Sequence, residues 1–204
     1  ALKVKIDPST QFGFIKADYY KDAVFHIPFI AWYQVMNASL ALTTMEVLKN
    51  QIPVAMDKLQ VGIKNTRWQG RMETILPGVI VDGAHNEDGV RRFVETAERF
   101  QEEYPLTLLF SAVNDKDYQD MIHTICSRIR FRKVVTTEVG GYREVPSAQL
   151  AEIFRKEGCR EVGNSDNIEE AFHMACEAKG EDGMLFCVGS LYLVGEIKTL
   201  LLKK

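Results

Sequence analysis

From about residue 79 to its end, the chain repeats one pattern: a short run of apolar, mostly β-branched residues, then a turn, then a segment of helical periodicity. The strand-like runs are VIVD (79–82), LTLLFSA (106–112), VVTTE (134–138), REVG (160–163) and MLFCVG (184–189), and the helical segments are 90–100, 118–129, 150–154, 168–175 and 191–202. Parallel strands need crossover helices between them, and these helices cover both faces of the sheet. The sequence therefore predicts an α/β fold with a doubly wound, mostly parallel sheet.

Four polar residues stand at the ends of predicted strands: Asp82, Ser111, Thr137 and Ser190. The carboxyl ends of parallel strands lie along one rim of a sheet, and ligands of such folds bind beyond that rim. For Ser111 and Thr137 we expect helix capping or turn chemistry. For Ser190 an N-cap role and a ligand contact both stay open.

Charge and cysteine content exclude several classes of protein. Acidic and basic residues nearly cancel, at a net charge of −3, so no basic field attracts nucleic acid or an anionic membrane. No apolar run approaches the ~20 residues that a membrane span requires. The four cysteines are scattered without a CxxC pair, so we expect reduced core residues of a cytosolic protein.

The first 70 residues follow a different pattern. LKVKI (2–6) alternates, DPST (7–10) is typical of a turn, and residues 12–29 predict one or two further strands. One helix is then expected to open at Asn37 and another to cover 53–63. Strands and helices without a partner sheet look like the end of a domain that begins upstream.

The predicted helix at Asn37 has a candidate buried face, and a linker follows the second helix. The apolar positions of that face are Leu40, Ala41, Met45 and Leu48. Residues 64–78 form the predicted linker. Without their upstream partners, several apolar side chains are expected to be exposed and to make the chain prone to association: Phe25, Ile27, Phe29, Ile30 and Trp32.

The stretch DGAHNEDG (82–89) combines a carboxylate and an imidazole at the turn between a strand and a helix. A glycine directly after the strand permits a sharp turn, and a strand-end carboxylate such as Asp82 can accept hydrogen bonds from ribose hydroxyls. The phosphate-binding pattern GxGxxG is absent, so a Rossmann dinucleotide site is not supported. The structural alternative is that Asp82 satisfies the turn while His85 or Asn86 caps the helix. Both interpretations stay open.

Two further residues are candidates for ligand contacts. Arg71, in the glycine-preceded stretch GRME (70–73) of the predicted linker, could hold a phosphate in a bidentate fork. An exposed linker arginine is more often only solvated. Asn37, at a predicted helix start, is more often an N-cap than a ligand contact.

Six motifs, taken together and in order, resemble one family. They are QVMNASLAL (34–42), WQGRME (68–73), PGVIVDGAHNEDGV (77–90), SAVNDKD (111–117), YREVP (142–146) and GSLYLVGEI (189–197). This set is similar to the successive signatures of the folylpolyglutamate synthase and dihydrofolate synthase family, within the Mur ligase superfamily. The resemblance covers nearly the whole chain and is weakest over the first 30 residues.

The resemblance implies an ATP-dependent amide ligase. In such enzymes the substrate carboxylate takes the γ-phosphoryl group of ATP to form an acyl phosphate, and the amine of L-glutamate then displaces phosphate. Asn37 matches the family's adenine contact, Arg71 the arginine that reaches the ATP phosphates, and Asp82 the acid that holds the nucleoside. His85 and Ser190 match positions near the incoming glutamate, which makes Arg71 and His85 the candidate catalytic residues. The carboxylate substrate would be folate or dihydropteroate.

One departure from the family sets the expected extent of the chain. The family's ATPase domain opens with a GxxxxGK[ST] phosphate loop, which this sequence lacks. The ligands for Mg²⁺ are likewise expected upstream. We therefore expect residues 1–70 to be the end of a truncated ATPase domain and residues 71–204 a complete Rossmann-like ligase domain, belonging to a cytoplasmic, monomeric enzyme and almost inactive alone.

Two other functions remain as alternatives. One is a non-catalytic module that binds a small molecule or a partner and lacks the phosphate loop. The other is a Mur-type ligase acting on a cell-wall precursor, which the DGAHN stretch (82–86) disfavours.

Overall fold

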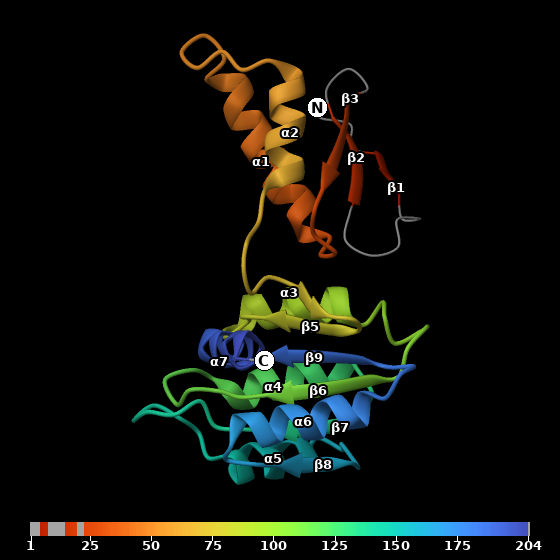
Figure 1. The fold of residues 1–204 in the computed structure, drawn as a ribbon, viewed down its shortest axis with the longest axis vertical. Helices are drawn as coiled ribbons and strands as arrows, with labels where there is room; N and C mark the ends of the chain where they lie inside the picture. The colour runs from red at the N-terminus through yellow and green to blue at the C-terminus, as the bar shows by residue number, and fades with distance from the viewer. Residues whose placement is uncertain (1–4, 8–14, 20–22, 204) are drawn as a thin grey trace. The chain divides into compact units, whose positions relative to one another are not determined.

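The computed structural model describes residues 5–7, 15–19 and 23–203, with side chains from residue 23 onward. The chain divides into two compact units, Ala1–Gln69 and Gly70–Lys204. Each unit has its own sheet (Figure 1). Each also has its own cluster of buried apolar side chains. The division falls inside the stretch 64–78 that we expected to be a linker, one residue before the expected boundary.

The first unit contains an antiparallel sheet with the described strands in the order β1-β2-β3, together with two helices. Its elements are β1 (Lys5–Asp7), β2 (Ile15–Tyr19), β3 (Ala23–Ile27), α1 (Tyr33–Val47) and α2 (Met56–Asn65). Strands β2 and β3 account for the strands expected between residues 12 and 29. Residues 8–10 of the predicted turn lie outside the described residues.

The core of the first unit forms between β3 and both helices. Phe25 and Ile27, each 1% exposed, pack with Val35 and Ala38 of α1. Partly buried side chains complete this cluster: Ala23, Phe29, Trp32, Leu42, Leu59 and Ile63. The prediction that Phe25 and Ile27 are exposed is therefore wrong, because the two helices cover them within the unit.

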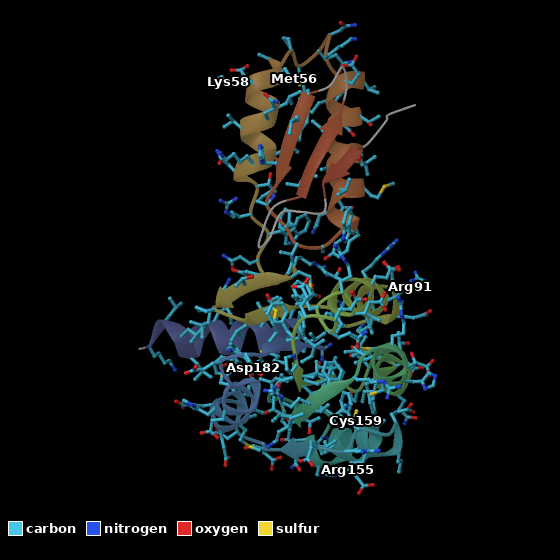
Figure 2. The ribbon with its side chains drawn as sticks, turned by 90° about the vertical axis from the view of Figure 1, so that its right-hand side faces the viewer. Met56, Lys58, Arg91, Arg155, Cys159 and Asp182 are labelled. Carbon is cyan, nitrogen blue, oxygen red and sulfur yellow. The ribbon has the colours of Figure 1, made fainter. Side chains whose placement is uncertain are left out.

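Helix α1 begins one turn earlier than predicted. It starts at Tyr33, so Asn37 lies inside the helix and does not open it. The predicted buried face is also wrong at Leu40, which is 68% exposed, and at Ala41. The sheet selects a face further round the helix, where small and β-branched side chains fit against β3. Most of the exposed apolar side chains of this unit lie instead on the helices and the loop between them, and Met56 at the start of α2 is 41% exposed (Figure 2).

The second unit is the α/β domain that the sequence predicts, with a mostly parallel sheet. Its strands are β4 (Glu73–Leu76), β5 (Val79–Asp82), β6 (Leu106–Phe110), β7 (Phe131–Thr136), β8 (Val162–Asn164) and β9 (Met184–Val188), in the order β4-β5-β9-β6-β7-β8. Its helices are α3 (Glu87–Ala97), α4 (Tyr118–Arg128), α5 (Ser147–Lys156), α6 (Ile168–Lys179) and α7 (Leu191–Leu202). All five predicted strands and all five predicted helices are present; β5 and α7 have the predicted ends, and the ends of the others are shifted.

The strand order shows how the sheet is wound. The connections from β5 to β6, β7 and β8 step in one direction, and the return from β8 places β9 between β5 and β6. Since parallel crossovers are right-handed, α3, α4 and α5 cover one face and α6 the other. The contacts agree: α3 packs against α4, α4 against α5, and α6 against α7. The winding therefore reverses at β9.

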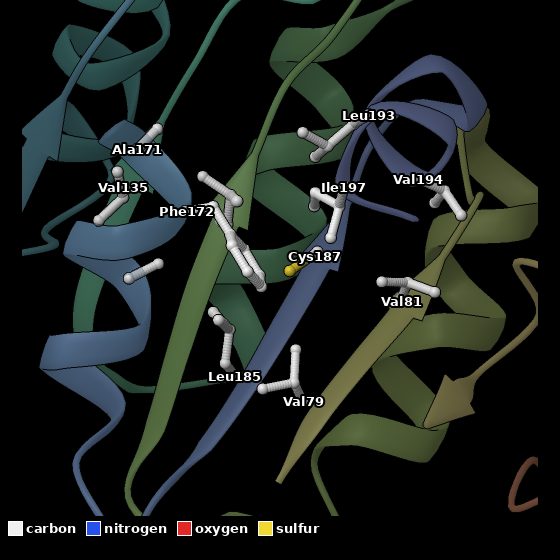
Figure 3. Close-up of a cluster of buried hydrophobic side chains, with 12 residues drawn as sticks. Val79, Val81, Val135, Ala171, Phe172, Leu185, Cys187, Leu193, Val194 and Ile197 are labelled. Carbon is white, nitrogen blue, oxygen red and sulfur yellow. The ribbon is translucent and has the colours of Figure 1, made fainter. Parts of the chain in front are cut away.

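Successive residues of β9 pack on opposite faces of the sheet. Leu185 and Cys187 belong to a buried cluster with side chains of β5, α6 and α7 (Figure 3). Phe186, between them, packs edge-on against Phe93 of α3 with the ring centroids 5.5 Å apart. This alternation explains why β9 is apolar along its whole length.

The predicted linker is wrong over half of its length. Helix α2 continues to Asn65, and residues 73–76 form β4, which pairs antiparallel with β5. Pro77 and Gly78 join these two strands, and Gly78 has a φ of 69°. A Pro-Gly pair with positive φ at glycine is typical of a type II turn. Only residues 66–72 remain outside regular structure.

The cysteine prediction is only partly correct. Cys187 is fully buried, whereas Cys126, Cys159 and Cys176 are partly exposed, and none of the four forms a disulfide in the described part of the chain. Cys159 lies just beyond the end of α5 (Figure 2). Among the described residues, no helix has the length and apolar character needed to cross a bilayer.

The close approach of β9 to β6 requires glycine at position 189. Gly189 has a φ of 108°, and a Cβ there would lie 2.1 Å from the Ser111 carbonyl oxygen. We expect Gly189→Ala to lower the free energy of unfolding by about 2–4 kcal/mol, since backbone strain and overpacking each cost about 1–3 kcal/mol. Urea unfolding followed by circular dichroism measures this change.

The matched control is Gly195→Ala in α7, where an added Cβ meets no atom within 4 Å. Alanine favours a helix interior by about 1 kcal/mol over glycine, so this variant should be as stable as the wild type or slightly more so. Equal stability of the two variants would contradict the prediction.

Candidate functional site

The carboxyl ends of the four neighbouring strands β5, β9, β6 and β7 are in register. Asp82 pairs with Val188, Val188 with Phe110, and Phe110 with Thr136. The residues predicted at strand ends therefore lie along one rim, as expected. Helix α3 leaves β5 on one face and α7 leaves the neighbouring β9 on the other, which makes this the topological switch point where α/β folds bind ligands.

The carboxylate of Asp82 is buried at this rim, with 3% of the residue exposed. One oxygen accepts a hydrogen bond from the Met72 N–H and the other from the Ala84 N–H, both at 2.8 Å. Burial raises the pKa of Asp82 from 3.8 to about 6, against the lowering effect of these two donors and of the positive charges of Arg71 and His85. Asp82 therefore satisfies its turn, as the structural interpretation predicted, and also binds a second segment of the chain.

That second segment is the turn 70–72, which carries Arg71. The Gly83 N–H donates to the Gly70 carbonyl at 2.8 Å, and the Met72 N–H donates to Asp82. The backbone on each side of Arg71 is thus bonded to the end of β5. The expectation that Arg71 sits in an exposed linker is wrong, because its turn is an integral part of the second unit.

The conformation of the 70–72 turn is unusual for its sequence. Gly70 has a φ of 66° and Met72, a buried residue, has a φ of 45°. A positive φ is energetically unfavourable for a residue with a side chain, such as Met72. It persists only where surrounding contacts impose it. Glu73 adds such a contact, since it accepts from the Gly70 N–H at 2.7 Å and pairs with Lys198 of α7 at 2.8 Å.

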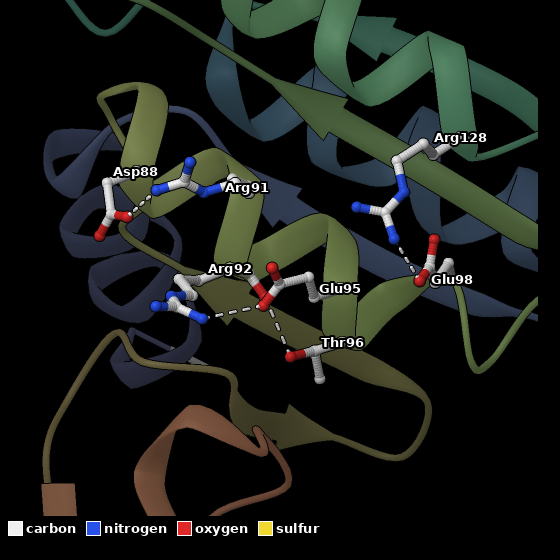
Figure 4. A network of polar contacts seen from close by, with 7 residues as sticks. All are labelled: Asp88, Arg91, Arg92, Glu95, Thr96, Glu98 and Arg128. Carbon is white, nitrogen blue, oxygen red and sulfur yellow. Dashed lines mark hydrogen bonds and ion pairs between the residues drawn. The ribbon is translucent and has the colours of Figure 1, made fainter. Parts of the chain in front are cut away.

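The Arg71 side chain itself is partly exposed. Within the described part of the chain, its guanidinium makes no hydrogen bond or ion pair, although its charge acts on Asp82. Arginines on the neighbouring helix α3 behave differently: Arg91 pairs with Asp88 and Arg92 with Glu95 (Figure 4). Arg71 is therefore a positioned cation whose charge is not matched by a surface carboxylate.

His85 lies in the turn that follows Asp82. Its Nδ1 is 2.7 Å from the Gly83 carbonyl oxygen. A carbonyl can only accept, so Nδ1 carries a hydrogen, and in the neutral form of the ring the lone pair lies on Nε2. The helix cap is Asn86, whose side chain accepts from the Gly89 N–H at 2.8 Å. Of the two proposed caps, Asn86 is correct and His85 is not.

Ser190 caps α7, as its structural interpretation predicted. It is 2% exposed, and its hydroxyl accepts from the Tyr192 N–H at 3.1 Å. The next residue, Leu191, packs on Gly83 so closely that a Cβ on Gly83 would lie 2.2 Å from Leu191 Cδ2. This contact brings the turn at Ser190 against the turn after Asp82 and explains the glycine of the DGAHN stretch.

The expected capping by Ser111 is wrong. Its hydroxyl is buried and has no hydrogen-bond partner in the described part of the structure. Helix α4 is capped by Asp117, which accepts from the Asp120 N–H at 3.2 Å. Thr137 makes only a long local contact, 3.4 Å to the Glu138 carbonyl. A buried hydroxyl without a hydrogen-bond partner lowers the stability of the fold. The Ser111 hydroxyl is therefore an unusual feature at the end of β6.

One contact at the rim could not be read from the sequence. Arg143 lies 3.1 Å from a carboxylate oxygen of Asp115 and 3.1 Å from the Tyr192 hydroxyl. It thereby joins the loops after β6 and β7 to the first turn of α7. Both loops belong to motifs noted in the sequence, but spacing along the chain carries no information about which side chains pair across it.

The remaining candidate, Asn37, belongs to the first unit. It is exposed on α1, and its amide donates to the Gln34 side chain at 2.8 Å. The structure thus brings four candidates together within the second unit: Arg71, Asp82, His85 and Ser190. Among the described residues, no cluster of three or more histidine, cysteine, aspartate or glutamate side chains could hold a metal ion.

Comparison of the sequence with known proteins identifies the family of this chain. Residues 70–191 match the family model described as Mur ligase, glutamate ligase domain. A curated dihydrofolate synthase/folylpolyglutamate synthase of Bacillus subtilis is 30% identical over 179 residues, covering 83% of this chain and 39% of the relative. A probable bifunctional folylpolyglutamate synthase/dihydropteroate synthase of Haloferax volcanii is 27% identical over 175 residues, covering 85% of this chain and 20% of the relative.

Superposition on solved structures finds the same fold in folylpolyglutamate synthases. The folylpolyglutamate synthase of Thermotoga maritima superposes with a TM-score of 0.77 at 25% identity, over 98% of this chain and 46% of that one. The Mycobacterium tuberculosis enzyme complexed with ADP and AMPPCP has the same fold, with a TM-score of 0.79 at 22% identity, over 96% of this chain and 46% of that one. The chain spans less than half the length of these relatives. It belongs to the Mur ligase family, whose glutamate ligase domain it contains, on the branch of the folylpolyglutamate and dihydrofolate synthases.

Proposed function

We propose that this chain is the C-terminal part of an ATP-dependent ligase that adds L-glutamate to the carboxylate of folate or dihydropteroate. Family membership and the curated relatives support the reaction class. ATP supplies the γ-phosphoryl group that activates the substrate carboxylate as an acyl phosphate. Residues 1–70 would then be the end of the ATPase domain and residues 71–204 the ligase domain of a cytoplasmic, monomeric parent enzyme.

The observation that carries this proposal is the turn that fixes Arg71. Phosphoryl transfer depends on positioning and on positive charge at the phosphates. Arg71 offers a guanidinium without a carboxylate partner among the described residues, on a backbone bonded on both sides to Asp82 and Gly83. A planar guanidinium binds phosphate oxygens in pairs, so a fixed Arg71 can hold a phosphate in one orientation.

Asp82 has two tasks in this proposal. It positions Arg71 through the Met72 N–H, and it accepts a hydrogen bond from the nucleoside. Each carboxylate oxygen accepts one backbone N–H and retains a further lone pair, so a hydroxyl donor fits the chemistry. Asn37, with an amide oxygen and two N–H donors, fits the edge of an adenine ring.

His85 and Ser190 would act on the amino acid substrate. An amine attacks an acyl phosphate only after losing a proton, and the lone pair on His85 Nε2 can accept one. The Ser190 hydroxyl accepts from the Tyr192 N–H and keeps its own hydrogen, which a substrate carboxylate can accept. The Mg²⁺ ligands and the phosphate loop would come from the rest of the parent enzyme.

A second candidate is a non-catalytic module that binds a small molecule or a partner. Such a module would not need a GxxxxGK[ST] stretch, and the sequence given contains none. The reading frame upstream of Ala1 separates the two, because the ligase requires a phosphate-loop motif there. A Mur-type ligase for a cell-wall precursor would require a nucleotide-linked peptide substrate, and the curated relatives on the folate branch disfavour it.

The parent enzyme tests the reaction directly. Incubated with ATP, Mg²⁺, L-glutamate and either a reduced folate or dihydropteroate, it should release phosphate only when both the amino acid and the pterin substrate are present. Phosphate release is measured with a coupled colorimetric assay. Release that is independent of either substrate would refute the ligase proposal.

Removal of Arg71 tests the role of the fixed turn. In the parent enzyme, Arg71→Ala should lower kcat/KM by about 10²–10³-fold, the usual effect of losing one charge-stabilising donor. Arg71→Lys keeps the charge without the fork and should retain intermediate activity. The matched control is Arg91→Ala, a paired surface arginine of α3 that should leave kcat/KM unchanged (Figure 4). If Arg71→Ala unfolds the domain instead, its role is structural.

The pH dependence of stability tests the burial of Asp82. Its pKa is about 6 in the folded chain, against an ordinary value of 3.8 for an exposed aspartate, so the folded state holds the proton more tightly than the unfolded state. Stability from the neutral carboxyl is complete below pH 4 and is lost as the pH rises through 6. Between pH 4 and pH 7 the wild type should lose about 2 kcal/mol more unfolding free energy than Asp82→Asn.

Urea unfolding at a series of pH values measures both proteins. Asparagine cannot accept the second backbone N–H, so the variant carries a constant offset, and only the difference in slope is informative. Parallel pH profiles would contradict the raised pKa.

A further inference from the structure

Two cysteines that are 33 residues apart in the sequence meet at the surface of the second unit. Cys126 lies in the last turn of α4, and Cys159 follows the end of α5. Their sulfur atoms are 3.6 Å apart. Two thiols in contact differ from the scattered core cysteines that the sequence predicts, and they raise the question of what this pair can do.

The backbone that carries Cys159 is held in place by the end of α5. Gly158 has a φ of 94°, and its N–H donates to the Arg155 carbonyl at 3.0 Å. The Cys159 N–H donates to the Phe154 carbonyl, also at 3.0 Å. These two bonds and the left-handed glycine form a Schellman motif. Phe154 is fully buried, so Cys159 is anchored to the core through this motif.

The backbone that carries Cys126 is equally well fixed. Its neighbour Ile125 is fully buried, and the Ile129 N–H closes the helix by donating to the Ile125 carbonyl at 3.0 Å. A second contact holds the same two elements together: His123 Nδ1 lies 2.9 Å from Glu157. Both cysteines are therefore pre-positioned, and bringing their sulfurs together costs little further conformational entropy.

Accessibility favours reaction of both thiols, and acidity selects Cys159 as the one that attacks first. Both thiols are partly exposed, so a small oxidant can reach them. The hydrogen bond between the sulfurs lowers the pKa of Cys159 and raises that of Cys126, while the neighbouring Glu157 carboxylate opposes ionisation of both. Cys187, in contrast, is fully buried, and burial raises the pKa of its thiol.

We propose that Cys126 and Cys159 form an intramolecular disulfide on reaction with a low-molecular-weight disulfide such as oxidised glutathione. The Cys159 thiolate attacks one sulfur of the oxidant, which breaks the S–S bond and releases one thiolate. The Cys126 thiolate then attacks the Cys159 sulfur of the mixed disulfide and releases the second. The protein loses two electrons and two protons, and the oxidant becomes two thiols.

The two sulfurs are already close to bonding distance. A disulfide needs a sulfur separation of about 2.05 Å, so the sulfurs must approach by about 1.5 Å, and we expect rotation about the Cα–Cβ bonds to contribute to this approach. The bond would join α4 to the end of α5 and close a loop that contains β7. Closing such a loop restricts the unfolded chain and stabilises the folded one.

Mass spectrometry of the purified chain tests this proposal. After incubation with oxidised glutathione, the intact mass should fall by about 2 Da. Trypsin separates all four cysteines into different peptides, so the bond should join the peptide 117–128 to the peptide 157–160. Dithiothreitol should restore the two separate peptides. The oxidised form should also melt higher, by on the order of 5–10 °C.

Two serine variants make the result specific. Cys159→Ser should abolish the mass loss and give at most a glutathione adduct on Cys126. Cys176→Ser, which changes the partly exposed cysteine of α6, should form the same linked peptides as the wild type. An unchanged mass, stable glutathione adducts on both cysteines without a link, or a linked form that melts lower than the reduced chain would each overturn the proposal.

Discussion

The buried carboxylate of Asp82 is the interaction on which the candidate site depends. It lies at the end of β5 and bonds to the backbone of two segments, the turn that follows the strand and the turn 70–72 that precedes β4. Removing a carboxylate from water is costly, and two N–H donors with a nearby cation offset that cost only in part. A neutral side chain at position 82 would make the folded chain more stable than a buried carboxylate does. A carboxylate in such a position is expected when it organises a functional site.

The rest of the rim forms because chain segments approach each other closely at two glycines. Gly83 admits Leu191 from the start of α7, and Gly189 lets β9 run against β6. These contacts gather the chain segments around positions 71, 83, 111 and 190, which are far apart in sequence. Each helix that follows then starts at a defined point, because Asn86 and Ser190 cap α3 and α7. The rim is therefore fixed by short-range sterics and capping.

Much of this could be predicted, and the rest could not for identifiable reasons. Strand and helix periodicities are local, so they predicted the fold of the second unit, and a strand-end position followed by glycine predicted the turn at Asp82. The pairing of β4 with β5 is also local, and although residues 64–78 were predicted to be a linker, the Pro77–Gly78 turn could have indicated it. The buried face of α1 was missed because the sheet of the first unit, and not the helix sequence, selects it.

Other features depend on contacts that no single stretch of sequence encodes. The bond between Asp82 and Met72 crosses a hairpin, and the contact between Cys126 and Cys159 depends on how two helices pack. The orphan hydroxyl of Ser111 is visible only once every neighbour is placed. The family resemblance supplied candidate residues for the site, but their positions follow from tertiary structure.

Arg71 differs from the arginines of α3 because the acid near it, Asp82, is buried. On α3, Arg91 and Arg92 lie beside carboxylates one helical turn away, and solvent screens both partners (Figure 4). Arg71 acts on a carboxylate whose two oxygens are already bonded to backbone N–H groups, so the guanidinium keeps its donors. The acid fixes the backbone of Arg71 without occupying its side chain. A cation held in this way suits an anion that must bind and leave in every turnover, since no resident ion pair has to break first.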